Sequence, residues 1–333
     1  MLTHRVAIVG VWHVHAADYL AEALARPDTE VAGIWDEEPE RLDAFEAGRH
    51  LHRYQSLESL LSDDTIDAVI ITSSTATHRQ LIHAALNAGK HVFVEKVMAP
   101  SLAEVRELYR QAGESGKVLH GSFQRLREGW VGETVDLIAS GRLGRLTSTR
   151  VRYQHPGRVE GWLPEDFVDP ARAGGGVLID LAVHGLYLSQ ELHGAFPVEV
   201  QVAASSMLGG VEDTSIVLMR FPDDSLSVLE ASLVSAPGGL FAEAFGTHGT
   251  VTAGFDGIRF MRRGDSEWTS RPAPEAGTTP LAEFFRQIDS PHATDDVPAR
   301  VLRVAALVDA VYAANHTRTA VAVIDPVITE GHR

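Results

Sequence analysis

The sequence predicts two domains of different classes. We expect an α/β domain with a doubly wound parallel sheet over residues 1–124, and an α+β domain with a mostly antiparallel, open-faced sheet over residues 125–333. In the first part, near-continuous apolar runs alternate with helical patterns, which is typical of a parallel sheet with helices on both faces. In the second part, apolar and polar residues alternate along the runs, which is typical of antiparallel strands with one covered face.

Six short apolar runs mark the strands of the first domain, and the third run is weak. The runs span residues 5–10, 30–36, 52–56, 66–73, 90–96 and 117–124. Two amphipathic segments between them predict helices: one ends at Gly89, and another, capped by Ser101, ends at Gly113. Strand–helix alternation implies right-handed crossovers, so ligands are expected beyond the carboxyl ends of the strands.

The second domain is predicted as a meander-like sheet with helices on one side. A helix over residues 130–141 precedes a strand over 145–154, and a loop rich in proline, glycine and aromatic residues fills 156–173. A helix then follows three glycines. Further alternating runs span residues 198–206, 213–221, 225–234, 249–255 and 258–263, with "PDDS" as a hairpin turn between two of them. Helical patterns over 280–288 and 298–316 follow.

The composition favours a small-molecule partner. The chain has 333 residues, of which 45 are acidic and 29 basic, and its formal net charge is -16. Such a surface repels the phosphates of nucleic acids and anionic lipids, so we expect neither a nucleic acid nor a membrane as partner. No apolar run approaches the ~20 residues that cross a bilayer, and we expect no secretion signal. The absence of cysteine excludes disulfides and thiolate metal sites, and it fits a reducing cytoplasm.

The stretch "RVAIVGVWHVHAADYL" predicts an apolar strand, a glycine turn and a helix. A dinucleotide-binding domain begins in this way, because the helix N-terminus offers N–H groups and a positive dipole end to a pyrophosphate. Gly10 is placed for the tight turn, but Trp12 and His15 stand where further glycines are expected. Either the loop, with Trp12, His13 and Val14, binds a dinucleotide in a modified way, an imidazole donating to a phosphate, or it has lost its cofactor. A metal on His13 and His15 lacks a third ligand in this loop, so no metal is expected.

An acidic turn follows the second strand. Asp36 lies about twenty residues beyond the glycine turn, where a carboxylate usually holds the adenosine ribose. Glu37 and Glu38 come next with no arginine, so a 2′-phosphate would meet repulsion, and NAD is favoured over NADP. The alternative is a solvated acidic turn before Pro39.

Lys96 is predicted to end a buried strand at the carboxyl edge of the sheet. A lysine there is costly unless it is paired or useful. It suits donation to a substrate hydroxyl, or removal of its proton if desolvation lowers the lysine pKa. Glu95 is expected to point to the opposite side. The alternative is a strand-end lysine that reaches into solvent.

Asp180 and His184 stand four residues apart in the helix after the three glycines. At this spacing they share one helix face, which is otherwise apolar. A carboxylate fixes the tautomer of an imidazole and stabilises its protonated form, which prepares a general acid or base near neutral pH. The alternative is a simple ion pair.

Several of these motifs together resemble the Gfo/Idh/MocA family, which includes glucose–fructose oxidoreductase and inositol dehydrogenase. They are "DAVIITSSTATHRQLIHAALNAGKHVFVEK", "GGGVLIDLAVHG", "SGRLGRL", "GTHGTV" and "ANHTRTAVAV", in this order along nearly the whole chain. The resemblance implies a nicotinamide-binding Rossmann domain and an open-faced sheet that joins a homodimer or homotetramer. It also implies reversible oxidation of a secondary alcohol in a sugar, cyclitol or related polyol.

The resemblance also assigns roles to residues. Lys96, Asp180 and His184 correspond to the catalytic lysine and D-x-x-x-H pair, with Asp180 orienting His184. Either Lys96 or His184 takes the hydroxyl proton, and the three groups should titrate together. Glu95 would lie near the nicotinamide ribose. The turn "TSSTATH" would line the cofactor through Ser73, Ser74, Thr75 and His78.

One departure from the family pattern is Val97, which replaces the proline of the E-K-P motif and so removes a conformational restraint. Candidate substrate residues are Gln124, Arg127, Tyr153 and Trp162, with His155 and Arg158 beside them, and each has a packing role as the alternative. Two other functions stay open. One is a non-catalytic ligand or nucleotide sensor, and the other is a lyase or glycosidase that recycles NAD.

Overall fold

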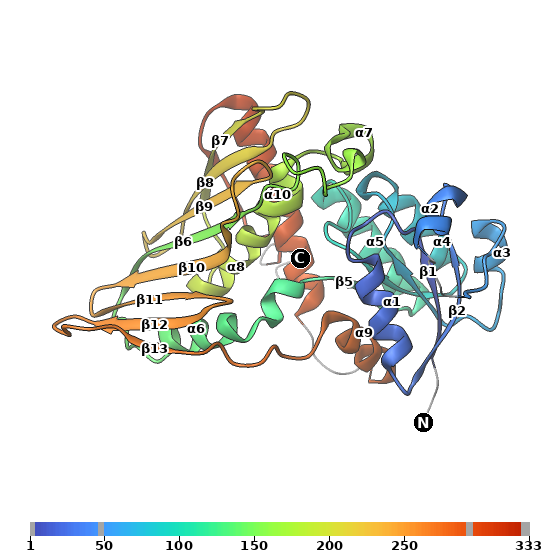
Figure 1. The fold of residues 1–333 in the computed structure, drawn as a ribbon, viewed down its shortest axis with the longest axis horizontal. Coiled ribbons are helices and arrows are strands. Elements are labelled where there is room, and N and C mark those ends of the chain that lie inside the picture. Colours follow the sequence, from blue (N-terminus) through green and yellow to red (C-terminus); the bar gives the residue numbers. More distant parts are fainter. Residues whose placement is uncertain (1–3, 46–49, 291–295, 328–333) are drawn as a thin grey trace. The chain divides into compact units, whose positions relative to one another are not determined.

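The computed structural model describes residues 4–45, 50–290 and 296–327, and the chain divides into two compact units (Figure 1). The first unit contains Met1–Ser122 and Pro280–Val301, and the second contains Phe123–Thr279 and Leu302–Arg333. The boundary expected from the sequence gives all residues after 124 to the second domain, whereas residues 280–301 pack with the first unit. Within the described ranges, no helix is long and apolar enough to cross a membrane.

The first unit alternates strands and helices. Its strands are β1 (His4–Val9), β2 (Thr29–Trp35), β3 (Ala68–Ile71), β4 (His91–Val94) and β5 (Leu119–Gly121). Its helices are α1 (Ala16–Ala25), α2 (Pro39–Phe45), α3 (Leu57–Leu61), α4 (His78–Asn87), α5 (Leu102–Ser115) and α9 (Pro280–Asp289), with a 3₁₀ turn η1 (Thr75–Thr77).

All neighbouring strands of this five-stranded sheet are parallel, in the order β2-β1-β3-β4-β5. The weak strand expected over residues 52–56 is wrong: only Arg53 forms a bridge, in parallel to Ile34 of β2. That bridge lies where a dinucleotide-binding sheet of order 3-2-1-4-5-6 places its third strand. The sheet therefore has the Rossmann arrangement, with one edge strand reduced to a single bridge.

The core on one face of this sheet is completed from far along the chain. Val6, Ile8 and Phe93 of the sheet belong to the same buried cluster as Phe284 and Phe285 of α9. The side chains of α1, Tyr19, Leu20 and Ala23, join this cluster. Because alternate residues of a strand face opposite sides, the intervening apolar residues face the other layer of helices.

The prediction for α5 is correct at its N-terminus and wrong at its C-terminus. The Ser101 side chain accepts the N–H of Glu104, which confirms the N-cap. The helix does not end at Gly113, because it continues to Ser115 and is capped by Gly116 at φ 65°. Gly89 follows α4 at φ 71°, as expected of a glycine that ends a helix.

The second unit is built on a nine-stranded sheet. Its strands are β6 (Leu146–Gln154), β7 (Glu199–Ser205), β8 (Thr214–Arg220), β9 (Leu226–Ser232), β10 (Gly239–Gly246), β11 (Gly249–Gly254), β12 (Gly257–Arg262), β13 (Thr269–Arg271) and β14 (Val321–Ala322). Its helical segments are η2 (Gln124–Arg127), α6 (Gly129–Ala139), η3 (Glu165–Val168), α7 (Pro170–Ala173), the π-helical turn η4 (Leu178–Ala182) and α8 (Val183–His193). Helix α10 (Val297–Thr317) begins in the first unit and continues into the second.

The strand order is β13-β12-β11-β10-β6-β9-β8-β7-β14 (Figure 1), and every neighbouring pair is antiparallel except β6 and β9. This confirms the predicted fold class. Helices α6 and α8 pack on one face of the sheet. The "PDDS" turn joins β8 to β9 as expected. Strand β10 is missing from the prediction, because its inward residues include Ala242 and Ala244, which give a weak apolar alternation.

His193 at the end of α8 connects this helix to the sheet through two hydrogen bonds and a ring contact. Its Nδ1 lies 2.8 Å from the Ser225 hydroxyl and its Nε2 lies 2.9 Å from the Thr149 hydroxyl. Its ring stacks on Phe221 with a centroid distance of 3.7 Å. Burial lowers the pKa of His193 to about 4, so the native state keeps this imidazole neutral at mildly acidic pH.

The low pKa of His193 predicts acid sensitivity. The unfolded chain binds this proton near pH ~6.5, whereas the folded chain binds it only near pH 4. The free energy of unfolding should therefore fall as the pH falls through this window, by at most about 1.4 kcal/mol per pH unit for this group. We expect His193→Gln to remove this share of the slope in urea unfolding. If the free energy of unfolding depended on pH equally in the variant and the wild type, the assignment would be contradicted. Burial also lowers the pKa of His91, so His91 contributes part of the pH dependence in both proteins.

Candidate functional site

The turn after β1 passes so close to β3 that only glycine fits. Gly10 has φ 81°, and a Cβ atom there would lie 2.6 Å from the Cα of Ser73. Its N–H donates to the carbonyl of Trp35 at the end of β2, at 2.7 Å. The Thr72 hydroxyl donates to the Gly10 carbonyl at 2.5 Å. Gly10 therefore holds the ends of β1, β2 and β3 together, as its position in the sequence predicts.

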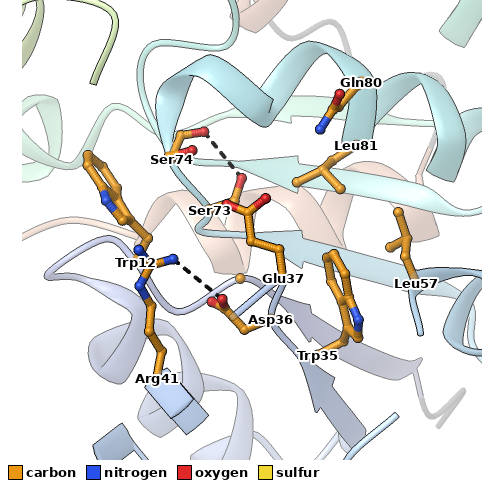
Figure 2. Close-up of a pocket in the computed structure, with 11 residues that line it drawn as sticks. Trp12, Trp35, Asp36, Glu37, Arg41, Leu57, Ser73, Ser74, Gln80 and Leu81 are labelled. Atoms are coloured by element: carbon orange, nitrogen blue, oxygen red, sulfur yellow. Dashed lines mark hydrogen bonds and ion pairs between the residues drawn. The ribbon is translucent and has the colours of Figure 1, made fainter. Parts of the chain in front are cut away.

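Asp36 fixes the same turn from the end of β2. Its carboxylate accepts the N–H of Val11 at 2.7 Å and that of Glu38 at 2.8 Å, and its residue is only 3% exposed. The prediction that no arginine lies near is wrong, because Arg41 lies 3.5 Å from the Asp36 carboxylate (Figure 2). Arg41 also pairs with Glu38 at 3.0 Å. A carboxylate has about four acceptor positions, so Asp36 keeps the capacity to accept a ribose hydroxyl.

A pocket of about 320 Å³ opens beside these residues, at the carboxyl ends of β1, β2 and β3 (Figure 2). Its wall combines acidic groups, two indoles and small hydroxyl side chains. The lining residues are Gly10, Trp12, Trp35, Asp36, Glu37, Arg41, Leu57, Ser73, Ser74, Gln80 and Leu81. Ligands of doubly wound sheets bind at this kind of place, where the strand order reverses. Trp12 is therefore part of the pocket wall.

The N-terminus of α1 keeps two backbone donors for a ligand. The N–H of His13 donates to the Thr72 carbonyl at 2.9 Å, and the N–H of His15 donates to Nδ1 of His13 at 3.2 Å. The N–H groups of Val14 and Ala17 have no acceptor among the described residues, and the Val14 residue is 46% exposed. A phosphate at this helix end would meet these two amides and the positive end of the helix dipole.

The turn after β3 contributes only some of its expected residues to the pocket. Ser73 and Ser74 line it, whereas Thr75 is buried and outside its lining. His78 is 1% exposed, with Nδ1 2.7 Å from the Val97 carbonyl and Nε2 3.1 Å from the Ser73 carbonyl. Burial lowers the pKa of His78, so the neutral ring donates to one of the two carbonyls at a time. His78 thus connects the turns after β3 and β4.

Glu95 and Lys96 follow β4 and do not belong to it, because the strand ends at Val94. Glu95 is 1% exposed; its carboxylate accepts the Tyr19 hydroxyl and, at 2.7 Å, the N–H of Lys96. Burial raises the pKa of Glu95, but the charges of His13 and Lys96 and the Tyr19 hydrogen bond outweigh burial and lower it overall. Lys96 is 9% exposed, and the Lys96–Val97 peptide bond is cis.

The structure brings a carboxylate to the two histidines of the first loop. His13, His15 and Glu95 each place a ligand atom within 4.8 Å of the others, so a third group is present that the loop sequence does not show. However, Nδ1 of His13 accepts the N–H of His15, which leaves the ring proton on Nε2, 3.9 Å from the Glu95 carboxylate. The three groups form an acid–base cluster at the start of α1, in which His13 and Glu95 lie at ion-pair distance.

In the second unit, two of the three glycines before the segment that carries Asp180 have close neighbours. A Cβ on Gly175 would collide with the Tyr312 hydroxyl, and a Cβ on Gly176 would collide with the Glu212 carbonyl. The Glu212 carboxylate accepts the N–H of Gly176 at 3.0 Å and the Tyr312 hydroxyl at 2.9 Å. The absence of a side chain at these two glycines thus allows close approach of neighbouring segments.

The sequence predicts one regular α-helix for Asp180 and His184, but the structure does not have one. Asp180 lies in the π-helical turn η4, and His184 lies in the first turn of α8. The shared face of Asp180 and His184 stays a prediction. Nδ1 of His184 lies 2.5 Å from the hydroxyl of Tyr187, a partner that the sequence analysis missed. The pattern His-x-x-Tyr on a helix is the signal that would have indicated it.

Tyr153, one of the candidate substrate residues, lies near His184. Its ring meets that of His184 at 5.5 Å between centroids, and its hydroxyl accepts Nη2 of Arg125 at 3.1 Å. Trp162 is 51% exposed and packs on His155 at 4.7 Å between ring centroids. Arg125 was not among the candidates, although it lies in the same short segment as Gln124 and Arg127.

The other candidates show structural contacts. Arg158 pairs with the buried Asp213 at 3.1 Å. The carbonyl of Arg127 accepts the N–H of Gly277 at 2.7 Å. Gln124 is half-buried at the start of η2. The roles of Gln124, Arg127, Tyr153 and Trp162 toward a substrate stay predictions.

Both halves of the chain match known domains. Residues 4–123 match the Gfo/Idh/MocA oxidoreductase family with its NAD-binding Rossmann fold, and residues 132–252 match the Gfo/Idh/MocA C-terminal domain. The chain is 31% identical to the 1,5-anhydro-D-fructose reductase of Ensifer adhaerens over 74% of each protein. It is 27% identical to the myo-inositol 2-dehydrogenase of Thermotoga maritima, over 62% of this chain and 61% of that protein.

Solved structures show the same fold. GenD2 from gentamicin A biosynthesis, in complex with NAD, superposes with a TM-score of 0.82 at 24% identity and 97% coverage of both chains. Levoglucosan dehydrogenase, in complex with NADH and levoglucosan, gives a TM-score of 0.81 at 21% identity, covering 96% of this chain and 99% of that one. The two matched domains and the 31% identical reductase show that this chain belongs to the Gfo/Idh/MocA family of oxidoreductases.

Proposed function

We propose that this protein is an NAD-dependent oxidoreductase that acts on a secondary alcohol, or the corresponding ketone, of a sugar, cyclitol or related polyol. The observation that carries the proposal is the pocket that Gly10 and Asp36 form at the carboxyl ends of β1 and β2. The reductase and dehydrogenase relatives support the class of substrate.

The residues of the first unit fit a dinucleotide. Gly10 allows the tight turn beside Ser73, Asp36 offers acceptor positions to a ribose, and the exposed residue Val14 offers its N–H just before α1. Glu37 lines the pocket, and Arg41 is already paired with Asp36 and Glu38, which favours NAD over NADP. NAD, when bound, accepts or supplies a hydride at C4 of its nicotinamide.

The protein's own contribution to the reaction is proton transfer and positioning. We assign the exchange of the substrate hydroxyl proton to Lys96 or His184, both of which are buried and therefore respond strongly to nearby charge. Asp180 orients the histidine in this proposal. Ser73, Ser74, Thr75, His78 and Glu95 shape the cofactor side, and Tyr153 and Trp162 shape the substrate side.

The proposal extends to assembly and location. Strand β8 exposes Ile216 and Leu218, which are 46% and 44% exposed, on the face opposite Val217 and Met219. Apolar residues on an open sheet face favour association with another copy, so we propose a homodimer or homotetramer through this sheet. The absence of cysteine supports a cytoplasmic location.

A binding titration tests the cofactor. Trp12 and Trp35 line the pocket, so energy transfer from these indoles should report bound NADH. We expect saturable NADH binding, at least about tenfold weaker binding of NADPH, and loss of both with Asp36→Arg, which removes the acceptor of the Val11 N–H. Arg41→Ala tests whether Arg41 binds a 2′-phosphate. If the wild type bound NADPH more tightly than NADH, and Arg41→Ala abolished that preference, the NAD assignment would be contradicted.

Gly10→Ala tests the turn itself. The added Cβ meets the backbone of Ser73, and φ 81° is strained for alanine, so NADH binding should weaken by at least about tenfold. Gly113→Ala is the matched control, because no atom lies within 4 Å of its Cβ position inside α5. The control should bind NADH normally and gain about 0.5–1 kcal/mol of stability. Normal binding by a folded Gly10→Ala protein would contradict the role of the turn.

A turnover screen tests the reaction. Polyols and sugars should yield NADH with NAD, and Lys96→Met should reduce kcat by roughly 10²–10⁴-fold while NADH binding is retained. Lys117→Met, in the same unit, is the control and should keep wild-type rates. Substrate conversion without net NADH release would point to a lyase or glycosidase, and binding of polyols without any conversion would point to a sensor.

A further inference from the structure

His184 has a close partner on its own helix. Its Nδ1 lies 2.5 Å from the hydroxyl oxygen of Tyr187, three residues further along α8, where both side chains share one face. The histidine is 5% exposed and the tyrosine 1%. The distance is that of a hydrogen bond, and the burial of both side chains shields this bond from solvent.

The tyrosine ring is held by packing. Phe123 meets Tyr187 edge-to-face, with 5.2 Å between the ring centroids. The Tyr187 ring in turn meets the imidazole of His184 at 5.6 Å and an interplanar angle of 74°. These contacts fix the ring, so the hydroxyl stays directed at one nitrogen of the histidine.

A positive charge lies close to this hydrogen bond. Burial works to lower the pKa of the Arg125 guanidinium, but its proximity to the hydroxyls of Tyr153 and Tyr187 and its contact with Glu128 raise it overall. Arg125 donates to Tyr153 at 3.1 Å and to Glu128 at 3.0 Å. A nearby cation makes a phenol hydroxyl more acidic and therefore a stronger hydrogen-bond donor.

We propose that Tyr187 is a positioning residue that donates its hydroxyl proton to Nδ1 of His184 and so keeps the neutral imidazole protonated on Nε2. An imidazole in this tautomer presents an N–H group at Nε2 and has no free nitrogen to take a proton, so the exchange of the substrate hydroxyl proton falls to Lys96. Such an N–H group stabilises the negative oxygen that forms when a ketone is reduced. The catalytic meaning of the inference rests on the proposed oxidoreductase function, whereas the tautomer itself does not.

The tautomer is measured directly by nitrogen NMR of the full chain labelled with ¹⁵N-histidine. His184→Asn identifies the signals of His184. In the wild type we expect an unprotonated Nδ1 and a protonated Nε2 for the neutral ring. Tyr187→Phe keeps the ring that packs on Phe123 but removes the donor, so the two tautomers of His184 should become mixed. His193, bonded to Ser225 and Thr149 on the same helix, is the internal control whose signals should not move.

Kinetics then separate positioning from simple packing. With NADH and a ketone substrate, Tyr187→Phe should lower kcat roughly 100-fold and change KM less than about threefold, because the ring orientation matters most in the transition state. A His184 protonated on Nδ1 in the wild type, an unchanged tautomer in Tyr187→Phe, or an unchanged kcat would each overturn the proposal. If no substrate is turned over at all, the proposed function fails, and the NMR result still decides the role of Tyr187.

Discussion

The first unit depends on the close approach of Gly10 to the backbone of Ser73. A side chain of any size on residue 10 would collide with this backbone just beyond the paired ends of β1 and β3. The same peptide segment ties β2 into place, through the Gly10 N–H to Trp35 and the Val11 N–H to Asp36. The pocket wall is therefore made by hydrogen bonds between strand ends, and its shape does not require the second and third glycines of the usual motif.

The sequence predicts those parts of the molecule whose causes are local. Gly10 is recognisable because a tight turn between a buried strand and a helix favours glycine, and Ser101 because a hydroxyl caps the first N–H groups of a helix. The four strong strands of the first unit are recognisable because both faces are buried, so their apolar runs are continuous. Asp36 follows from its distance to the glycine turn. The edge run over 52–56 is weak in sequence and forms only the bridge at Arg53.

The rest depends on contacts that spacing does not encode. The π turn that contains Asp180 cannot be recognised from a four-residue interval. Glu95 meets His13 only because the turns after β1 and β4 meet at the same sheet edge. Arg41 reaches Asp36 from the first turns of α2, which a search of the adjacent residues does not include. In each case the decisive distance is between residues whose separation depends on a loop or an irregular helix.

The position of α9 has a consequence for how the protein is made. Phe284 and Phe285 complete the core beneath Phe93, yet they are synthesised after nearly the whole second unit. While the ribosome extends the chain, the nascent Rossmann sheet therefore lacks part of one apolar layer. Domains fold in order of synthesis when each is continuous. Here the core of the N-terminal domain is complete only after α9 has emerged from the ribosome. A nascent chain that stalls between residues 122 and 280 therefore exposes an apolar surface that chaperones can bind.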